Sequence, residues 1–488
     1  MAIPLSGLIL VPLTLGIFCF TSYLGEWAVF CAVLQGAALV NMSGGFAVAL
    51  SPYFFVAALM VVRIIPRWAM GKVGFFAKEP VAMQVRILAI FTAWCVFSAL
   101  VLPVLFEGVP VDDPRAGVDK SYYIQSSLHL TSSNLGQAGY MILNFAMIMY
   151  VVQLAIRPAR LERLVGAFSW SGVFVAAVGA LQIVCPHLGV PFPAWLFNSN
   201  QVWAQATNQH IAGDFSRMSA TFVEPSEAAG FLAAWSVFEL SLAISGGRHD
   251  GRHWLWAGVG SFMLIKTTST TGYVTAGIMW IVMAWDCSKS ILYRGWIKIK
   301  GSLAVLVLGG AALVALFTVP GAWLLLDAVL LNKGQSQSAL HRTATFERAV
   351  GVFQNSWGLG VGLGSNRAMS VFFYVLSNLG FPGILLALIL LAQLFSEIRT
   401  RINRPDIERT TRSLMAALGS AFVANLIALL TSGAEITQPR LWILWGLLLA
   451  TIRKDWFLEG QGLPAGFPAN ARLVALHGRD SPLLVRAS

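Results

Sequence analysis

Three arginines accompany a glycine-rich stretch in the last third of the chain. Arg342 and Arg348 precede the segment "GLGVGLGSNRAMSVFF" at 358–373, and Arg367 lies within it. The planar guanidinium group binds two phosphate oxygens at once and keeps its charge when it is partly desolvated. Arginines in this density therefore indicate an anionic substrate. Arg342 and Arg348 are predicted to lie on an amphipathic helix whose apolar face is suited to lie along the membrane. The alternative to substrate binding is that the arginines of this helix only extend to lipid phosphates.

Four glycines alternate with other residues from Gly358 to Gly364. The pattern GxGxGxG differs from the GxGxxG fingerprint of dinucleotide sites, and no Lys-Ser or Lys-Thr pair follows it. A nucleotide-binding loop is therefore not favoured. Glycine still lets the backbone approach a ligand or a neighbouring helix closely. We predict that Gly360, Gly362 and Gly364 belong to a substrate-binding loop, with close packing as the simpler explanation of some of them.

A second polar segment, "DFSRMSATFVEPSEAAGF", occupies residues 214–231. It combines Arg217 with Glu224, a carboxylate that could accept a proton from an attacking hydroxyl group. The alternative is an interfacial ion pair and a helix start, capped by Ser226, that only fix where the helix enters the bilayer. Lys266, in "LIKTTSTTG", is a further cation that either joins the arginines or only extends to the lipid surface.

The composition of the chain places these residues in a membrane protein. Of the 488 residues, 57% are hydrophobic and 11% are charged, whereas an ordinary soluble domain has roughly 25% charged residues. Apolar runs such as that at 87–106 approach the roughly 17 to 25 residues that a spanning helix needs. Gly and Pro within these runs, without a ten-residue alternating pattern, favour helices over an outer-membrane barrel. The predicted fold class is an all-α, polytopic integral membrane protein.

Basic segments alternate with far-side loops along the chain. They lie at 63–86, 157–163, 246–253, 289–300, 397–412 and from 453 onward. The positive-inside rule assigns them to the cytoplasm, so the net charge of +11 reflects topology rather than nucleic-acid binding. Residues 1–460 then hold 12 or 13 transmembrane helices, because the first 62 residues form either three spans or two spans and a re-entrant segment. The side of the N-terminus stays open, and 461–488 is predicted to be a disordered cytoplasmic tail.

Three loops on the opposite side of the membrane are long, at 107–133, 185–226 and 321–367. Loops longer than about 12 to 15 residues are usually functional or disordered, and these carry aromatic residues and patterned charge. We therefore expect the site there. Charges deep within the spans are few, with Glu239 the main one, whereas ion-coupled transporters usually keep carboxylates at the middle of the membrane.

Neither a metal nor a cofactor is expected. The five cysteines have no ligand spacing. The segment "HDGRH" at 249–253 has the histidine spacing of a zinc helix but lacks the glutamate of that motif.

The polar segments occur together in an order that resembles a known family. "SRMSATFVEPSEAAGF" in one external loop, "NSWGLGVGLGSNR" in the next and "LSNLGFPGILLAL" at 376–388 are similar to motifs of the O-antigen polymerase and O-antigen ligase superfamily. The correspondence covers about residues 160–395. It implies a GT-C-like, metal-independent glycosyltransferase of the bacterial inner membrane with large periplasmic loops. Its partners would be polyprenyl-diphosphate-linked oligosaccharides and the bilayer, with polysaccharide export and chain-length proteins as further candidates.

The resemblance also implies roles for individual residues. Arg217 and Arg342 fall where family members engage the diphosphate, and Arg342 begins an R-x15-G pattern that ends at Gly358, as in the polymerases. Ligase members carry a histidine after the glycine stretch, which this chain lacks there. A polymerase is therefore preferred, with Arg217, Glu224 and Arg342 catalytic and Arg348, Arg367 and Lys266 binding substrate. A ligase and a lipid-linked sugar transporter are the alternatives.

Overall fold

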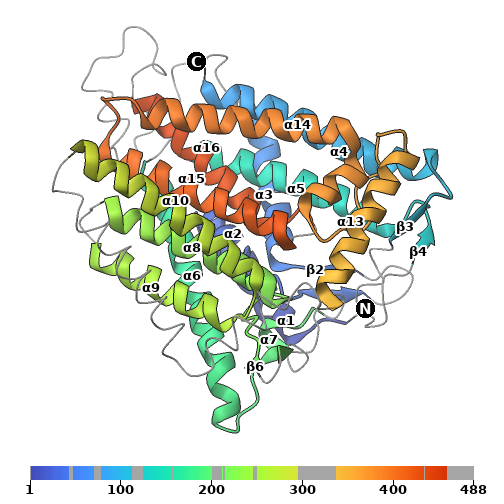
Figure 1. Ribbon diagram of the computed structural model, residues 1–488, viewed down its shortest axis with the longest axis horizontal. Coiled ribbons are helices and arrows are strands. Elements are labelled where there is room, and N and C mark those ends of the chain that lie inside the picture. The colour runs from blue at the N-terminus through green and yellow to red at the C-terminus, as the bar shows by residue number, and fades with distance from the viewer. Residues whose placement is uncertain are drawn as a thin grey trace.

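The computed structural model describes residues 2–42, 48–70, 79–112, 125–154, 158–200, 211–212, 215–245, 250–294, 337–432 and 435–458. These residues form a bundle of helices with three short antiparallel strand pairs (Figure 1). The predicted span at 302–320 and the tail 461–488 lie outside the described residues.

The helices alternate with short strand pairs along the chain. The helices are α1 (Leu5–Phe20), α2 (Leu24–Cys31), α3 (Pro52–Ala69), α4 (Pro80–Leu105), α5 (Ser132–Leu154), α6 (Pro158–His187), α7 (Ala194–Phe197), α8 (Pro225–Ser245), α9 (Asp250–Lys266), α10 (Thr270–Arg294), α13 (Gln337–Asn355), α14 (Val371–Ile402), α15 (Arg409–Ser432) and α16 (Pro439–Leu458). The strand pairs are β1 (Val40–Met42) with β2 (Val48–Leu50), β3 (Pro110–Asp112) with β4 (Gln125–Ser127), and β5 (Ile211–Ala212) with β6 (Phe215–Ser216).

Seven helices of the described residues are long and apolar enough to cross a membrane. They are α3, α4, α5, α6, α8, α14 and α15. Helix α1 and the first part of α10 are also apolar but shorter. The prediction of a mostly helical membrane protein is confirmed in these terms.

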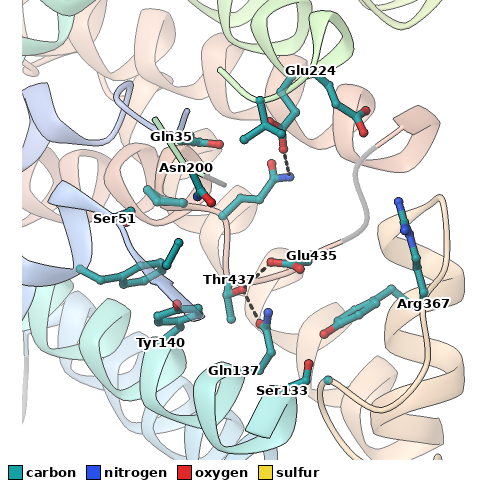
Figure 2. Close-up of a pocket in the computed structure, with 18 of the residues that line it drawn as sticks. Gln35, Ser51, Ser133, Gln137, Tyr140, Asn200, Glu224, Arg367, Glu435 and Thr437 are labelled. Atoms are coloured by element: carbon teal, nitrogen blue, oxygen red, sulfur yellow. Dashed lines mark hydrogen bonds between the residues drawn. The ribbon is translucent and has the colours of Figure 1, made fainter. Parts of the chain in front are cut away.

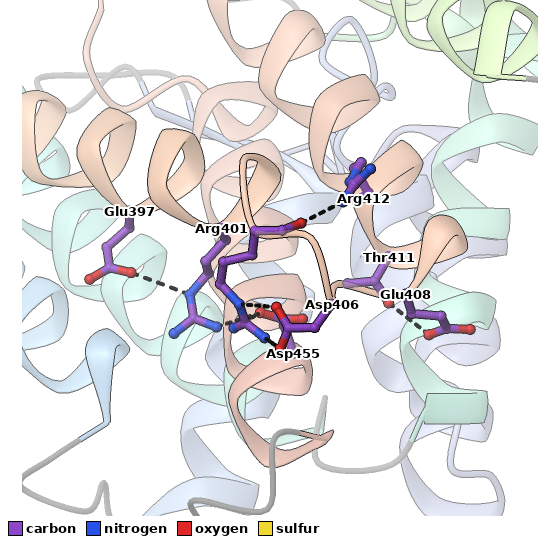
Figure 3. Close-up of polar contacts among 8 residues, drawn as sticks. Glu397, Arg401, Asp406, Glu408, Thr411, Arg412 and Asp455 are labelled. Carbon is purple, nitrogen blue, oxygen red and sulfur yellow. Dashed lines mark hydrogen bonds and ion pairs between the residues drawn. The ribbon is translucent and has the colours of Figure 1, made fainter.

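The basic segments at 397–412 and from 453 contact each other at one end of the bundle, here called the basic end. Asp455 of α16 contacts Arg401 of α14 at 2.5 Å and Arg404 at 3.4 Å (Figure 3). Arg409, at the start of α15, donates to the carbonyl oxygen of Ser245 at the end of α8 at 3.0 Å. Segments that the positive-inside rule assigns to one side are therefore in contact with one another.

The opposite end, here called the site end, collects the described parts of the long loops. The N–H of Gly36 donates to the carbonyl oxygen of Thr221 at 2.7 Å, which joins the N-terminal segment to the loop before α8. The N–H of Arg367 donates to the carbonyl oxygen of Asp112 at 3.0 Å, which joins the loop before α14 to β3. Helix α13 and strands β3 and β4 lie together at the right of Figure 1. The described parts of the long loops therefore contact the same end of the bundle.

The first 62 residues run along the bundle three times. Trp27 Nε1 donates to Thr14 Oγ1 at 2.9 Å, so residues 24–39 return beside α1. Helix α2 covers only eight residues of this return, and turns complete it. Helix α3 then leads back toward the basic end, where Arg63 donates to the carbonyl oxygen of Thr21 at 3.1 Å. Of these helices, α3 is long and apolar enough to cross a membrane, whereas α1 is apolar but shorter.

Helix α8 lies within the bundle and is almost entirely buried. It packs against α15 and α9. Its Trp235 fits because Gly172 of α6 has no side chain: a Cβ there would lie 2.1 Å from the indole ring. Dense packing of this kind leaves little freedom to the helix. Helix α8 therefore holds its first residues firmly at the site end.

Helix α13 confirms the amphipathic helix expected around Arg342, but its apolar face has a different neighbour. Phe346 stacks on Phe373 of α14 with ring centroids 4.3 Å apart, and Ala349 and Val352 are buried. The face therefore packs on the protein rather than lying along the membrane, because α14 offers it an apolar surface.

Helix α14 is interrupted near its start, at Gly380. The φ of +63° and ψ of −162° there suit glycine and disfavour other residues. A Cβ at this position would lie 2.2 Å from the carbonyl carbon of Leu359. The interruption therefore lets the glycine-rich loop pack directly against α14.

Candidate functional site

A cavity of about 180 Å³ lies at the site end. Its wall is formed by the segments before α3, α8 and α14, the start of α5, and the link between α15 and α16 (Figure 2). Of the predicted residues, Glu224, Gly364 and Arg367 line it. The two polar segments of the sequence therefore meet in space.

Arg217 and Glu224 belong to the same loop before α8. Glu224 lines the cavity, and its Oε2 accepts a hydrogen bond from Ser226 Oγ at 3.2 Å, so Ser226 does not act as the predicted helix cap. Burial lowers the pKa of Arg217, and the charge of Glu224 opposes that shift. Arg217 Nε is buried and has no hydrogen-bond partner among the described residues. An unsatisfied buried donor of this kind is suited to an anionic ligand.

Arg342 approaches this pair from α13. Its Nη1 donates to the carbonyl oxygen of Thr431, at the end of α15, at 2.8 Å. The charge of Arg342 contributes to the lowered pKa of Arg217, after the larger effect of burial. Two guanidinium groups that repel each other at a partly buried place are stabilised when an anion binds between them. The arrangement therefore favours an anionic ligand at Arg217 and Arg342.

Arg367 belongs to the loop before α14 and lines the cavity. Its side chain extends toward the side of the cavity that carries Glu224 (Figure 2). The backbone around it is fixed by β3: besides the bond from the Arg367 N–H, the N–H of Asp112 donates to Asn366 Oδ1 at 2.9 Å. Arg367 is therefore a third arginine at the site.

Arg348 and Lys266 do not line the cavity. Arg348 Nη1 contacts Asp112 Oδ1 at 2.9 Å. Burial raises the pKa of Asp112, and the charge of Arg348 opposes this shift, so Arg348 compensates a buried carboxylate. Lys266 is exposed at the end of α9, with its Nζ 5.7 Å from the ring centre of Phe262. Neither position supplies support for the predicted role in substrate binding.

The glycines of the loop have two different environments. Gly360, Gly362 and Gly364 all have positive φ, at +81°, +99° and +84°. A Cβ at Gly360 would lie 2.6 Å from the backbone of Asn378 in α14, and one at Gly362 would lie 2.6 Å from the carbonyl oxygen of Ser98 in α4. Close packing therefore explains these two, whereas Gly364 also lines the cavity.

Asn378 of α14 holds the glycine-rich loop in shape. Its Oδ1 accepts from the N–H groups of Ser365 at 3.0 Å and Asn366 at 2.9 Å. Its Nδ2 donates to the carbonyl oxygens of Asn366 at 2.8 Å and Tyr374 at 2.9 Å. These bonds satisfy buried backbone groups that an irregular loop leaves without helix or sheet partners. The neighbouring Arg367 is positioned by the same network.

Glu435 is a cavity residue that the sequence did not indicate. It lies on the short link between α15 and α16 and lines the cavity with Glu227, near the start of α8. Sequence reasoning concentrated on the long loops, where function is most often found. The available signal was an acidic residue between two apolar runs on the predicted far side.

Uncharged side chains hold Glu435 in place. Thr437 Oγ1 lies 3.5 Å from Glu435 Oε2 and donates to Gln137 Oε1 at 2.6 Å (Figure 2). A hydrogen bond from the Gln137 side chain also favours the ionised form of Glu435. Burial raises the pKa of Glu435, while these hydrogen bonds and the charge of Arg367 oppose the shift. Glu435 is thus a buried carboxylate at the cavity wall.

Comparison with known proteins does not assign the chain to a family. No family model matches the chain, and no curated protein matches it. The functional assignment therefore rests on the residues of the cavity and their chemistry.

Proposed function

We propose that the protein is a polysaccharide polymerase of the bacterial inner membrane. It transfers a growing glycan from polyprenyl diphosphate onto a lipid-linked repeat unit at the periplasmic face. The observation that carries the proposal is a cavity lined by Arg367 and by carboxylates from separate segments, with Arg217 and Arg342 close enough to act on each other by their charges. The order of these motifs resembles that of the O-antigen polymerase and ligase superfamily, which supports the same activity.

The chemistry of this reaction makes particular demands on the protein. The bond between the anomeric carbon and a diphosphate oxygen breaks, and negative charge develops on the diphosphate. Arg217 and Arg342 are suited to stabilise that charge, because fixed cations in a partly desolvated site need no reorganisation during the reaction. The attacking hydroxyl group also loses a proton, for which a carboxylate of the cavity can act as the base. The protein can therefore carry out both tasks with side chains alone.

The membrane arrangement follows the same proposal. The chain crosses the membrane 12 or 13 times in a GT-C-like fold, with the basic end in the cytoplasm and the site end in the periplasm. The seven candidate spans and the separation of the two ends support this arrangement. The polyprenyl tails of donor and acceptor would lie in the bilayer beside the apolar helices.

Replacing the two arginines tests the proposal. We predict that Arg217→Ala and Arg342→Ala each reduce chain elongation at least about 100-fold, since each removes a cation that stabilises the leaving group. The length of the polysaccharide made by cells that carry each variant is the measurement, with the amount of protein in the membrane measured in parallel.

Arg399→Ala is the matched control, because Arg399 is exposed in the last turn of α14 at the basic end. It should leave polymer length unchanged. Long polymer made by both site variants would contradict the proposal. Loss of transfer to a different acceptor would indicate a ligase instead, and a change in the sidedness of the lipid-linked substrate would indicate a transporter.

A further inference from the structure

The proposed reaction needs one base, and three carboxylates line the cavity. They are Glu224, Glu227 and Glu435, from the loop before α8, the first turn of α8 and the link between α15 and α16. A base must reach the acceptor hydroxyl group and must not be held by the arginine that binds the leaving group or by a buried structural cation. The contacts of each carboxylate decide between them.

Glu224 is coupled to the arginine that faces the donor. Its charge raises the pKa of Arg217, against the larger effect of burial. Ser226 Oγ also donates to its Oε2 at 3.2 Å. A carboxylate beside the diphosphate-binding arginine lies on the leaving-group side of the reaction. Glu224 is therefore suited to hold Arg217 in position rather than to take the proton.

Glu227 is tied to α16 by two contacts. Gln438 Nε2 donates to its Oε1 at 3.2 Å, and Arg440 Nη1 donates to its backbone carbonyl oxygen at 2.6 Å. The buried guanidinium group of Arg440 stands close enough to act on the carboxylate by its charge. Glu227 is therefore a partner of a buried cation, which is a structural role.

Glu435 is coupled to neither Arg217 nor Arg440. The charge of Arg367 favours its ionised form, after the larger effects of burial and of the Gln137 hydrogen bond. Its hydrogen-bond partners are the uncharged side chains of Gln137 and Thr437, which fix the carboxylate in one orientation at the cavity wall. Uncharged groups also line the cavity, including Tyr140 and Asn200. Amide, hydroxyl and aromatic groups of this kind are suited to a sugar.

We propose that Glu435 is the general base of glycan transfer, which rests on the polymerase function proposed above. The acceptor hydroxyl oxygen forms a bond to the anomeric carbon of the donor glycan, and the hydroxyl proton passes to the Glu435 carboxylate. The bond from the anomeric carbon to the diphosphate breaks, and its electron pair leaves with the diphosphate, next to Arg217 and Arg342. Electrons and protons balance without a further reactant.

The surroundings of Glu435 predict that the transfer rate falls at low pH. Arg367, Tyr374, Tyr140 and Glu227 face it from the loop before α14, α14, α5 and α8. Burial raises the pKa of Glu435 above its usual value. Because the base must be ionised, the transfer rate should fall as the pH drops through this raised value. Removing the carboxylate should remove that fall.

The test is the pH dependence of chain elongation by purified protein in liposomes that contain lipid-linked repeat unit. Glu435→Gln should reduce the rate at least about 100-fold and abolish the decline at low pH, because it keeps the shape and removes the base. Glu435→Asp should keep a measurable rate and the decline. Thr437→Val should move the decline to higher pH, because it removes a hydroxyl group that lies 3.5 Å from the carboxylate and that holds Gln137, and both groups favour the ionised form of Glu435.

Glu397→Gln is the matched control, since Glu397 forms a partly exposed ion pair with Arg401 at 3.3 Å at the basic end. It should behave as the wild type does. A Glu435→Gln variant that elongates chains at the wild-type rate, or a Thr437→Val variant whose decline stays at the wild-type pH, would overturn the role of Glu435 and leave the polymerase proposal standing. Wild-type protein that lengthens no chain would overturn both.

Discussion

Arg217 combines a buried donor with two charged neighbours. Its Nε is buried without a hydrogen-bond partner among the described residues, and Glu224 and Arg342 both act on its charge. A planar guanidinium group whose Nε–H has no acceptor among the described residues can bind two oxygens of one phosphate group. A lysine in the same place supplies the charge but not the geometry.

We therefore predict that Arg217→Lys restores only part of the activity that Arg217→Ala loses. The lysine variant should remain about 10- to 100-fold slower than the wild type in chain elongation, which corresponds to one lost charge-assisted hydrogen bond. The initial rate of product lengthening measures this. A lysine variant as fast as the wild type would show that only the charge of Arg217 is needed. Arg399→Lys is the control for replacing an arginine by a lysine outside the site.

At the residue scale the sequence indicated part of the site. Arg217 and Glu224 were indicated by the polar segment at 214–231, and Arg367 by the density of arginines around the glycine-rich stretch. Arg348 has the same signal but contacts the buried Asp112, a partner more than 200 positions earlier that no local pattern reveals. Glu435 was not predicted as a site residue, because the short link between two apolar helices that carries it contains no motif.

At the element scale the glycine-rich loop, α14 and α5 act together. The loop has an irregular backbone, and Asn378 supplies the hydrogen bonds that replace regular structure. Nδ2 of Asn134 in α5 also donates to the carbonyl oxygen of Leu363 at 2.9 Å. Two buried amides from different helices therefore set the path of the loop that carries Arg367.

We predict that Asn378→Ala lowers the stability of the protein by roughly 2–4 kcal/mol, because it leaves buried backbone groups without partners. The melting temperature of the detergent-solubilised protein measures the change, and elongation should fall with it, since Arg367 loses its support. Asn403→Ala, at the exposed end of α14, should leave the melting temperature nearly unchanged. An unchanged melting temperature for Asn378→Ala would contradict the role of this amide.

The sequence predicted the helices more securely than the surfaces against which they pack. The periodicity around Arg342 predicted α13, because an apolar stripe at helical spacing depends only on local sequence. Amphipathicity does not say which apolar surface covers the stripe, so the contact of Phe346 with Phe373 was not foreseen. The glycine pattern indicated close backbone approach, but α4 and α14 as its neighbours emerged only in three dimensions.

At the scale of the whole molecule, the two ends of one helical bundle differ in their charged contacts. The ion pairs of Arg401 and Arg404 with Asp455 stand at the basic end, and the cavity with Arg367 and Glu435 stands at the other. The positive-inside rule found this division because it depends on the sum of many charges rather than on any single contact. A site on the face away from the basic end is where lipid-linked sugars that have crossed the membrane would be joined.

The central claim is that this cavity joins lipid-linked repeat units into longer chains. The most direct measurement is the length distribution of the products after purified protein, reconstituted in liposomes, is incubated with a polyprenyl-diphosphate-linked repeat unit. The account predicts a ladder of lipid-linked products that grows by one repeat unit per step, with free polyprenyl diphosphate released at each step. Substrate that keeps its original length, with no polyprenyl diphosphate released, would contradict the account.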